Sequence, residues 1–410
     1  MGCEALSANP EKRGNTVYIV GIDIAKRSHE AIVLDNKGAV VKKAFSFANT
    51  TDGLEKLQGI LREISSNPDE FTVAMESTAH YWLALYSALK RRGYTVQVLN
   101  PLQSNALRGL YIRQVKNDQR DCFIIAEVIR FGRYTQGKPP TEDLFALREL
   151  CRARVFLVNM VADTKKKVIA LLDQVFPEYE TIFTNVCGLT SSELLSHCAT
   201  PEEILAIDTD KLVEILEEPS RRRFRRPKAE QIKEIAQNSF GILMAADTFS
   251  LLIKQHIEHV RFIEGQIAGI EAKIAEIFSR FDSCITTIPG IGPVLGATIF
   301  SEIGDISRFP SATKLVAFAG IDPTVQQSGE FVGTHNHMSK RGSPYLRRAL
   351  WQAATVAVLH DPALKAFHEK KLAEGKPYMN SIGHVTRKLT NIIFAIMRDN
   401  QPYVPRTAPG

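Results

Sequence analysis

Several features that would each indicate a particular class of protein are missing from this sequence. Its six cysteines are scattered, with no Cys-x-x-Cys pair and no histidine at zinc-ligand spacing from any of them. This pattern argues against zinc fingers and against the disulfide frameworks of small secreted domains. No apolar run reaches the length of a membrane span, and residues 1–13 lack the apolar core of a signal peptide. We therefore expect a cytoplasmic protein with reduced cysteines.

What the sequence does contain is ordinary in amount and uneven in distribution. The 410 residues are enough for two or three domains with a large core. Hydrophobic residues make up 44% and charged residues 23%, as in most globular proteins. The net charge of +6 is compatible with nucleic-acid binding but does not indicate it alone. The position of the basic residues is more informative, because five arginines and a lysine fall within residues 221–228.

The first hundred residues alternate between strand and helix patterns. Apolar runs rich in Val and Ile predict strands, Asn36-Lys37-Gly38 predicts a hairpin turn, and stripes of Leu and Ile predict helices. Strand, hairpin, strand, helix, strand, helix, strand is the order of an RNase H-like α/β domain, a mixed sheet with helices on its faces. We expect it over residues 16–145, after a disordered arm at 1–15. The predicted strands and helices cover residues 17–26, 30–35, 39–47, 54–64, 71–76, 81–92 and 94–99.

Four acidic residues in this domain are candidates for a metal site. Asp23 lies within an apolar strand, where a carboxylate is costly unless it is paired, hydrogen-bonded or metal-bound. Glu76 ends another short strand, and Asp118 and Asp121 are spaced to share one face of a helix. Taken singly, each could be a capped strand end or a solvated helix face. Together they predict a site for Mg²⁺ or Mn²⁺, which prefer such oxygen ligands and assist phosphoryl transfer.

Helical patterns dominate the rest of the chain. We expect a helical linker and insertion over residues 146–280, a mainly α domain over 281–400 and a disordered tail over 401–410. Isoleucines at spacings of three and four follow Val260 as far as Ile277. They predict either a coiled coil that joins subunits or one long helix packed on its own domain. The repeating positions are Val260, Ile263, Ile267, Ile270, Ile274 and Ile277.

The C-terminal domain carries a glycine-rich turn and a serine-rich loop. Residues 288–293, Ile-Pro-Gly-Ile-Gly-Pro, match the hairpin of a helix-hairpin-helix element, in which Pro289, Gly290 and Gly292 let the backbone approach DNA phosphates. In the following loop any of Ser328, Ser339 and Ser343 could be a nucleophile, and the pattern does not choose among them. Ser343 and Pro344 also suit the start of a helix.

With these motifs in place, the sequence resembles the DEDD-type serine transposases of bacterial insertion sequences, the bridge-RNA-guided recombinases. The resemblance covers most of the chain. Where the family has Gly-Asn before its Leu-Arg helix, this chain has Gly342-Ser343-Pro344. The matching segments are residues 21–23, 75–78, 118–121, 288–292, 328–329 and 340–347.

The resemblance implies a RuvC-like N-terminal domain and a C-terminal transposase domain with a helix-hairpin-helix element. It assigns the metal to Asp23, Glu76, Asp118 and Asp121 and makes Ser328 the nucleophile that forms a covalent phosphoserine link with DNA. It further implies a structured non-coding guide RNA, donor and target double-stranded DNA, and a composite site shared between subunits. We expect a dimer that assembles into a tetramer.

The predicted activity is RNA-guided DNA transposition, in which double-stranded DNA is cut and rejoined. The alternatives are a RuvC-like endonuclease that uses water and a non-catalytic DNA-binding protein. Phe224 could stack on a base within the basic run. The residues expected to contact nucleic acid are Pro289, Gly290, Gly292, Lys340, Arg341, Arg347, Arg221, Arg222, Arg223, Arg225 and Arg226.

Overall fold

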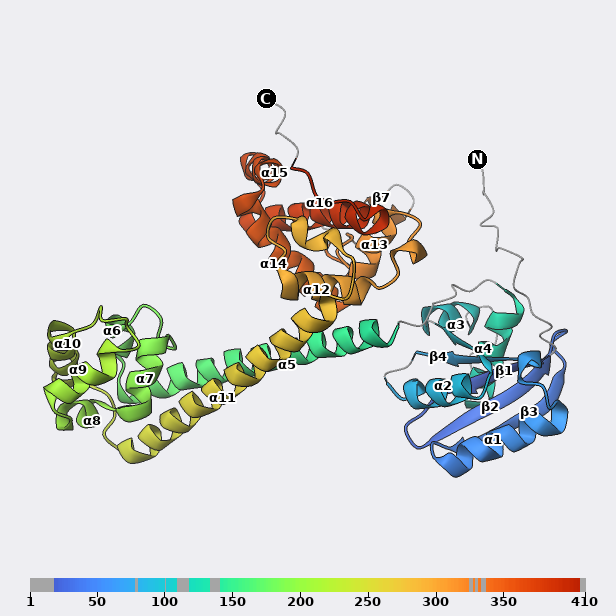
Figure 1. Ribbon diagram of the computed structural model, residues 1–410, viewed down its shortest axis with the longest axis horizontal. Coiled ribbons are helices and arrows are strands. Elements are labelled where there is room, and N and C mark those ends of the chain that lie inside the picture. Colours follow the sequence, from blue (N-terminus) through green and yellow to red (C-terminus); the bar gives the residue numbers. More distant parts are fainter. Residues whose placement is uncertain are drawn as a thin grey trace. The chain divides into compact units, whose positions relative to one another are not determined.

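The protein, represented by a computed structural model, divides into two compact units, Met1–Pro139 and Pro140–Gly410, each with its own hydrophobic core (Figure 1). The structure describes residues 18–77, 80–99, 101–108, 118–132, 141–323, 327–328, 331–332 and 337–405. The arm predicted at residues 1–15 lies outside these ranges, as do residues 406–410 of the predicted tail.

The N-terminal unit is built on a five-stranded mixed sheet with strand order β3-β2-β1-β4-β5. Its central strand, β1, runs antiparallel to β2 on one side and parallel to β4 on the other. This arrangement confirms the predicted mixed α/β sheet. The strands are β1 (Tyr18–Asp23), β2 (Ser28–Asp35), β3 (Val40–Ala48), β4 (Phe71–Glu76) and β5 (Thr95–Leu99).

Helices cover both faces of this sheet. Leu57 of α1 and Leu89 of α2 share a core with Ile22 of β1 on one face. On the other face, Ile125 of α4 packs with Ile19 of β1. Successive residues of β1 therefore serve opposite cores, as the period of two in a strand requires. The helices of this unit are α1 (Thr51–Ile64), α2 (Trp82–Arg91), α3 (Pro101–Arg108) and α4 (Asp118–Arg130), with a short η1 (Pro68–Glu70).

The described residues of the C-terminal unit form mostly helices, with one small hairpin and an isolated bridge between Pro323 and Met338. Its two longest helices, α5 (Glu142–Val175) and α11 (Ala246–Phe278), pack side by side (Figure 1). Lys165 on α5 pairs with Glu264 on α11, with 2.7 Å between Nζ and Oε1. The chain between these helices forms a small helical cluster at one end of the pair. The mostly helical architecture expected after the sheet is thus confirmed.

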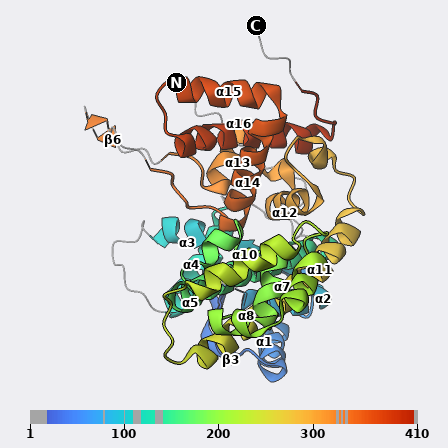
Figure 2. The same cartoon turned by 90° about the vertical axis from the view of Figure 1, so that its left-hand side faces the viewer.

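The small cluster has a core of its own, to which both long helices contribute. Leu172 of α5 and Ile253 of α11 are buried with Leu194 and Leu216 from the shorter helices. Figure 2 shows α7, α8 and α10 grouped together, and of these α7 packs on α11 while α10 packs on α8. The helices of this cluster are α6 (Tyr179–Ile182), α7 (Leu189–His197), α8 (Pro201–Ala206), α9 (Thr209–Glu217) and α10 (Arg226–Gln237).

At the other end of the long pair, α12 to α16 form the largest core of the molecule. It joins Leu147 of α5 and Ile277 of α11 to Ile299, Leu350 and Leu389. These helices are α12 (Pro293–Ile303), α13 (Ala312–Ala319), α14 (Pro344–His360), α15 (Pro362–Ala373) and α16 (Tyr378–Asp399), with η2 (Cys284–Thr287) and η3 (Ile306–Arg308).

The isoleucine seam of α11 packs inside its own chain. Val260 and Ile263 are buried against Val161 of α5, and Ile274 and Ile277 enter the large core. Most of the seam is therefore used by the α5–α11 pair. Of the two predictions for this segment, the structure agrees with a long helix on its own domain, and the seam offers no free apolar face for joining subunits.

None of the helices in the described ranges is both long enough and apolar enough to cross a membrane. The cytoplasmic location stays a prediction.

Candidate active site

Two of the predicted acids lie at the edge of the N-terminal sheet that is formed by the carboxyl ends of the parallel strands β1 and β4. Asp23 is the last residue of β1, and Glu76 is the last residue of β4. The strands are parallel and Ile22 lies opposite Met75, so one further step along each strand brings Asp23 level with Glu76. Neighbouring strands are about 5 Å apart, and side chains at equivalent positions point to the same face. Both carboxylates therefore lie on one face at the centre of the sheet edge.

A third acid reaches this edge from helix α4. Asp121 lies in the first turn of α4 and is 7% exposed. The helix can approach β1 closely because Gly21 has no side chain. A Cβ at this position would come within 2.0 Å of the carbonyl oxygen of Cys122. Burial, and then the negative charges of Glu30 and Asp23, raise the pKa of the Cys122 thiol to about 12. The start of α4 thus lies in the electrostatic field of the sheet-edge acids.

One acid at this edge was missed in the sequence. Glu30 lies directly opposite Asp23 in the antiparallel register of β1 and β2, on the same face of the sheet. The sequence feature that could have identified Glu30 is the presence of a carboxylate at the start of the apolar run that forms β2. A second missed residue is Ser104 of α3, whose hydroxyl donates a hydrogen bond to Oε1 of Glu76.

The fourth predicted acid, Asp118, begins helix α4 one turn before Asp121, and its side chain lies outside the described part of the structure. Within the described residues, no group of three or more Asp, Glu, His or Cys side chains is gathered as a metal site. The oxygen donors at the sheet edge nevertheless suit a hard divalent cation in their chemistry. The described acids therefore have the right kind of donor atom for such a cation and lie along the same edge of the sheet. They do not form a complete set of metal ligands in the described residues.

The predicted nucleophile belongs to a small hairpin in the C-terminal unit. Ser328 is the second residue of β6 (Gln327–Ser328) and lies opposite Phe331 of β7 (Phe331–Val332). Its side chain is outside the described part of the structure, as are Gly329 and Glu330. Both ends of the loop that contains this hairpin are held together, because the backbone N–H of Lys340 donates to the carbonyl oxygen of Gly320.

The other two candidate serines make contacts of their own. The Ser339 hydroxyl donates to Oδ1 of Asp322, at the base of the loop that carries Ser328. Ser343 caps helix α14 as predicted, since its Oγ accepts from the N–H of Leu346 at 3.2 Å. The same hydroxyl donates to the carboxylate of Glu302 at 2.7 Å. Ser343 is thus engaged in holding α14, whereas Ser339 lies beside a carboxylate that could accept its proton.

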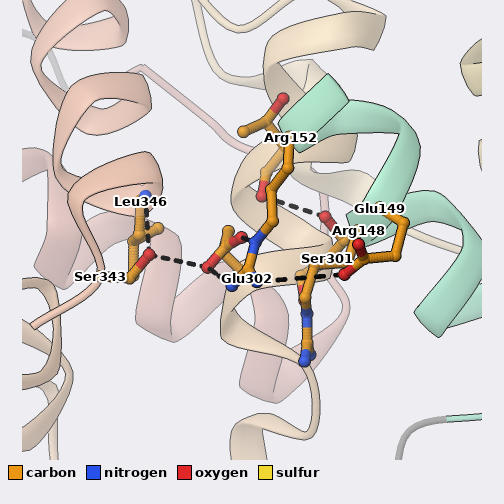
Figure 3. A network of polar contacts seen from close by, with 8 residues as sticks. Arg148, Glu149, Arg152, Ser301, Glu302, Ser343 and Leu346 are labelled. Carbon is orange, nitrogen blue, oxygen red and sulfur yellow. Dashed lines mark hydrogen bonds and ion pairs between the residues drawn. The ribbon is translucent and has the colours of Figure 1, made fainter. Parts of the chain in front are cut away.

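Glu302 is the centre of a polar network that joins three helices (Figure 3). It is 3% exposed, and Arg152 of α5 donates to both of its oxygens, with Nε to Oε1 at 2.6 Å and Nη2 to Oε2 at 3.2 Å. Arg148, one turn earlier on α5, donates from Nε to the carbonyl oxygen of Ser301 at 2.9 Å. The network ties the start of α14 to α5 and α12.

Comparison with models of known protein families identifies the family of this chain. A DEDD-type transposase model for IS110 elements matches residues 20–177, which contain all four predicted acids. A second model, described as the transposase IS116/IS110/IS902 family, matches residues 282–369, which contain the three candidate serines. The chain belongs to the IS110/IS116/IS902 transposase family. The predicted resemblance to the transposases of bacterial insertion sequences is thereby confirmed.

Related proteins match this transposase over nearly its whole length. The chain is 22% identical to an uncharacterized 43.6 kDa protein of insertion element IS110 from Streptomyces coelicolor, over 95% of this chain and 96% of the relative. It is 25% identical to an uncharacterized 44.8 kDa protein of IS116 from Streptomyces clavuligerus, over 94% and 96%. It is 23% identical to a pilin gene-inverting protein of Moraxella bovis, over 94% and 98%.

Two glycines of the glycine-rich turn at residues 288–293 differ in what surrounds their Cα atoms. At Gly290, where φ is +89°, a Cβ would come within 2.7 Å of the backbone nitrogen of Ala357, so this glycine lets the turn pack against α14. At Gly292 a Cβ would meet nothing within 4 Å. Gly292 is exposed at the N-terminus of α12, and Gly290 is half-buried with its Cβ position facing α14. Contact of their backbone amides with a phosphate stays a prediction.

The basic residues near α14 also differ in availability. Lys340 and Arg341 are exposed, and Lys340 has a φ of +52°. Arg347 is half-buried and donates from Nη1 to the carbonyl oxygen of Ala319 at 3.2 Å. Lys340 and Arg341 can meet a phosphate, and Arg347 has one nitrogen engaged by a neutral backbone carbonyl oxygen.

The basic run of the small helical cluster lies in the turn between α9 and α10. Arg226 pairs with Asp210 and Glu230, which offsets its charge. Phe224 is half-buried and packs on Phe183 with ring centroids 5.9 Å apart, and its stacking on a base stays a prediction. The cations that remain exposed in this turn are Arg221, Arg222, Arg223 and Arg225.

Proposed function

We propose that this transposase is an RNA-guided recombinase that cuts and rejoins double-stranded DNA through a serine nucleophile. The observation that supports the proposal is the shared edge of β1 and β4, where Asp23 and Glu76 end neighbouring parallel strands and where α4, which carries Asp121 in its first turn, packs against β1. A cluster of acids at the centre of a sheet edge suits phosphoryl transfer better than simple DNA binding, because binding a phosphate requires positive charge.

In this proposal Asp23, Glu76, Asp118 and Asp121 would hold Mg²⁺ or Mn²⁺, which would supply positive charge and Lewis acidity to the scissile phosphate. The hydroxyl of Ser328 attacks the phosphorus, an O–P bond forms, and one deoxyribose oxygen leaves. The exposed side chains of Lys340 and Arg341 offset the charge that develops on the phosphate oxygens. The released hydroxyl of another strand then attacks the phosphoserine, forms a new P–O bond, and expels the Ser328 oxygen, which regains its proton as the DNA is rejoined.

The remaining parts of the proposal concern partners and domains. We assign the RuvC-like function to residues 16–145, the linking helices to 146–280 and the transposase function to 281–400. Donor and target DNA, a structured non-coding guide RNA and a dimer that assembles into a tetramer belong to this proposal. The turn at residues 288–293 would serve as a helix-hairpin-helix contact to DNA through Gly292, since its Cβ position is open. The exposed arginines between α9 and α10 would contact a nucleic-acid backbone.

One observation favours a second candidate for the nucleophile. The hydrogen bond from the Ser339 hydroxyl to Asp322 places a carboxylate where it could accept a proton. Ser328 is preferred because it lies in the tip hairpin of the loop, whereas Ser339 lies in the loop base, where its backbone N–H also donates to Asp322.

The proposal is tested on a denaturing gel with purified protein, guide RNA, labelled donor and target DNA, and Mg²⁺. We expect a covalent protein–DNA adduct with the wild type, none with Ser328→Ala or Asp118→Ala, and an adduct with Ser339→Ala. An adduct lost only in Ser339→Ala would transfer the nucleophile to Ser339. Cleavage without an adduct that survives Ser328→Ala but not Asp118→Ala would favour the endonuclease that uses water. DNA binding without cleavage in the wild type would favour a non-catalytic protein.

A further inference from the structure

A groove in the C-terminal unit lies between α5, α12 and α14. Its volume is about 450 Å³, within the range of ~300–1,000 Å³ that is usual for small-molecule and cofactor sites. Val294 and Leu295, which line it, directly follow the glycine-rich turn at residues 288–293. The proposed function does not use this groove.

The lining of the groove combines flat apolar surface with positive charge. Tyr345 and Trp351 supply aromatic rings, and Val294, Leu295 and Val356 supply aliphatic surface. Arg154 and Arg348 also line it, and none of the lining residues in the described structure is acidic. An apolar peptide would match the aliphatic part but leave the two guanidinium groups without a matching charge. A nucleotide matches both parts, because its base is flat and its phosphate is negative.

The two arginines differ in the charge they leave available. Arg154 pairs with Glu271, with 2.6 Å between Nε and Oε1, so much of its charge is offset. Arg348 donates from Nη1 to the neutral amide oxygen of Asn159 at 2.6 Å and keeps its positive charge. Arg348 is therefore the residue that would attract a phosphate to the groove.

One wall of the groove is held in place by the Glu302 network. The guanidinium of Arg152 lies 5.0 Å from the ring centroid of Tyr345, and the same guanidinium is fixed by the buried carboxylate of Glu302 (Figure 3). Side chains that are already ordered lose little entropy when a ligand binds. The groove is thus prepared for a planar ligand.

From this combination we propose that the groove binds an unstacked nucleobase of a nucleic-acid strand, with Tyr345 and Trp351 along the base and Arg348 at its phosphate. The proposal rests on the proposed function, in which strands of DNA are exchanged and therefore leave their helical stack. The shared chemistry is a nucleotide, and the strand that supplies it is DNA or guide RNA.

Tryptophan fluorescence tests this directly. The chain has two tryptophans, so Trp82→Phe leaves Trp351 as the single reporter in the full-length protein. The probes are a 20-nucleotide oligo(dT), an oligo(rU) of the same length, and an abasic oligodeoxynucleotide with the same number of phosphates. We expect a base-bearing strand to quench Trp351 and to bind at least about fivefold more tightly than the abasic strand. The tighter of the two base-bearing strands identifies the source.

Paired variants separate the groove from general charge effects. In the Trp82→Phe background, Arg348→Gln should weaken binding of the base-bearing strand more than Arg387→Gln, which removes an exposed charge on α16. Val356→Glu should weaken it more than Leu359→Glu, because Val356 lines the groove and Leu359, one turn along and 72% exposed, does not.

Absence of quenching, or equal affinity for the abasic strand, would refute the proposal. Emission of Trp351 that changes with protein concentration alone would assign the groove to a second copy of the chain and also refute it. Formation of the Ser328 adduct is measured separately in the same protein. An adduct that forms while Trp351 stays unquenched would overturn the groove and leave the proposed function standing.

Discussion

Asp121 in the N-terminal unit and Glu302 in the C-terminal unit are both almost fully buried, at 7% and 3% exposed, but their surroundings differ. Glu302 lies among three helices and receives two hydrogen bonds from Arg152 and one from Ser343. Asp121 lies in the first turn of α4, which packs against β1, and Asp23 and Glu76 end the parallel strands β1 and β4. The first carboxylate is surrounded by positive and polar donors, whereas the second lies on a helix that packs against β1, the strand that ends in Asp23.

The contrast shows why burial of a carboxylate does not by itself identify a functional site. A buried acid with matched donors ties elements of the fold together, and its removal leaves the partner charge unpaired. Acids brought together by strand register raise one another's electrostatic energy, an arrangement that catalytic and metal sites use. The sign of the neighbouring charges therefore separates the two cases, and substitutions should separate them too.

The largest expected effect is the loss of catalysis on neutralising a sheet-edge acid. We expect Asp23→Asn to lower the rate of adduct formation by about a thousandfold or more, as when a charge that stabilises the transition state is removed. Its thermal unfolding should change little, because the substitution keeps the size and shape of the side chain. Glu30→Gln, directly opposite on β2, should lower the rate by about tenfold. Equal rates for Asp23→Asn and the wild type would contradict the assignment of the edge.

The next largest effect is on stability, and it belongs to Glu302. Glu302→Gln removes the charge that offsets Arg152 and should lower the free energy of unfolding by about 3 kcal/mol. Denaturant unfolding of the full chain measures this change. The matched control is Glu264→Gln, whose pair with Lys165 is more exposed and should contribute at most about 1 kcal/mol. A similar decrease in the free energy of unfolding in both variants would mean that the buried network around Glu302 contributes no more to stability than the exposed pair.

The N-terminal unit could be predicted well because its signals are local. The continuous apolar run of β1 indicates a strand buried on both faces, and the succession of such runs with helix patterns predicts a mixed α/β sheet. The place of Asp23 and Glu76 at one edge follows from parallel pairing alone. Glu30 could not be placed this way, because its position opposite Asp23 depends on how many residues the connection after β1 uses.

The C-terminal unit depends on contacts between distant residues, which local patterns do not encode. The repeat from Val260 to Ile277 correctly predicted a helix, but its partner, α5, lies far earlier in the chain. The cap by Ser343 was predictable from Ser343-Pro344, while its hydrogen bond to Glu302 was not. The same limit applies to Gly290, whose role depends on the approach of α14.

A smaller effect distinguishes a glycine needed for packing from one that is not. Gly21→Ala should lower the free energy of unfolding by about 2 kcal/mol, because the added Cβ must push α4 away from β1. Gly59→Ala, in the exposed middle of α1 with nothing within 4 Å, should raise it by about 0.5–1 kcal/mol. Thermal unfolding compares the two variants. Destabilisation by Gly59→Ala would show that the free space around a glycine Cβ position does not determine the effect of the substitution on stability.

The smallest effect concerns pH and a buried histidine near the same sheet edge. His29 is 1% exposed, and burial lowers its pKa despite the opposing effect of a hydrogen bond with the Asn49 side chain. Its Nδ1 accepts from the N–H of Ala25 at 3.3 Å, which favours the neutral ring. The unfolded chain takes up a proton near the usual pKa of 6.5, and the folded chain resists it. Stability linked to His29 is therefore full above that pH and is lost as pH falls below it.

One group can change the free energy of unfolding by at most about 1.4 kcal/mol per pH unit. His29→Asn keeps an acceptor near Nδ1 but cannot be protonated. Between pH 6.5 and 5.5, it should flatten the fall in stability seen in the wild type, measured by denaturant unfolding with Trp82 as the reporter of the N-terminal unit. His256→Asn is the control, since burial also lowers the pKa of His256, but this residue belongs to the other unit. If the slope seen by Trp82 flattened only in His256→Asn, the acid sensitivity would come from the helical unit instead of the sheet.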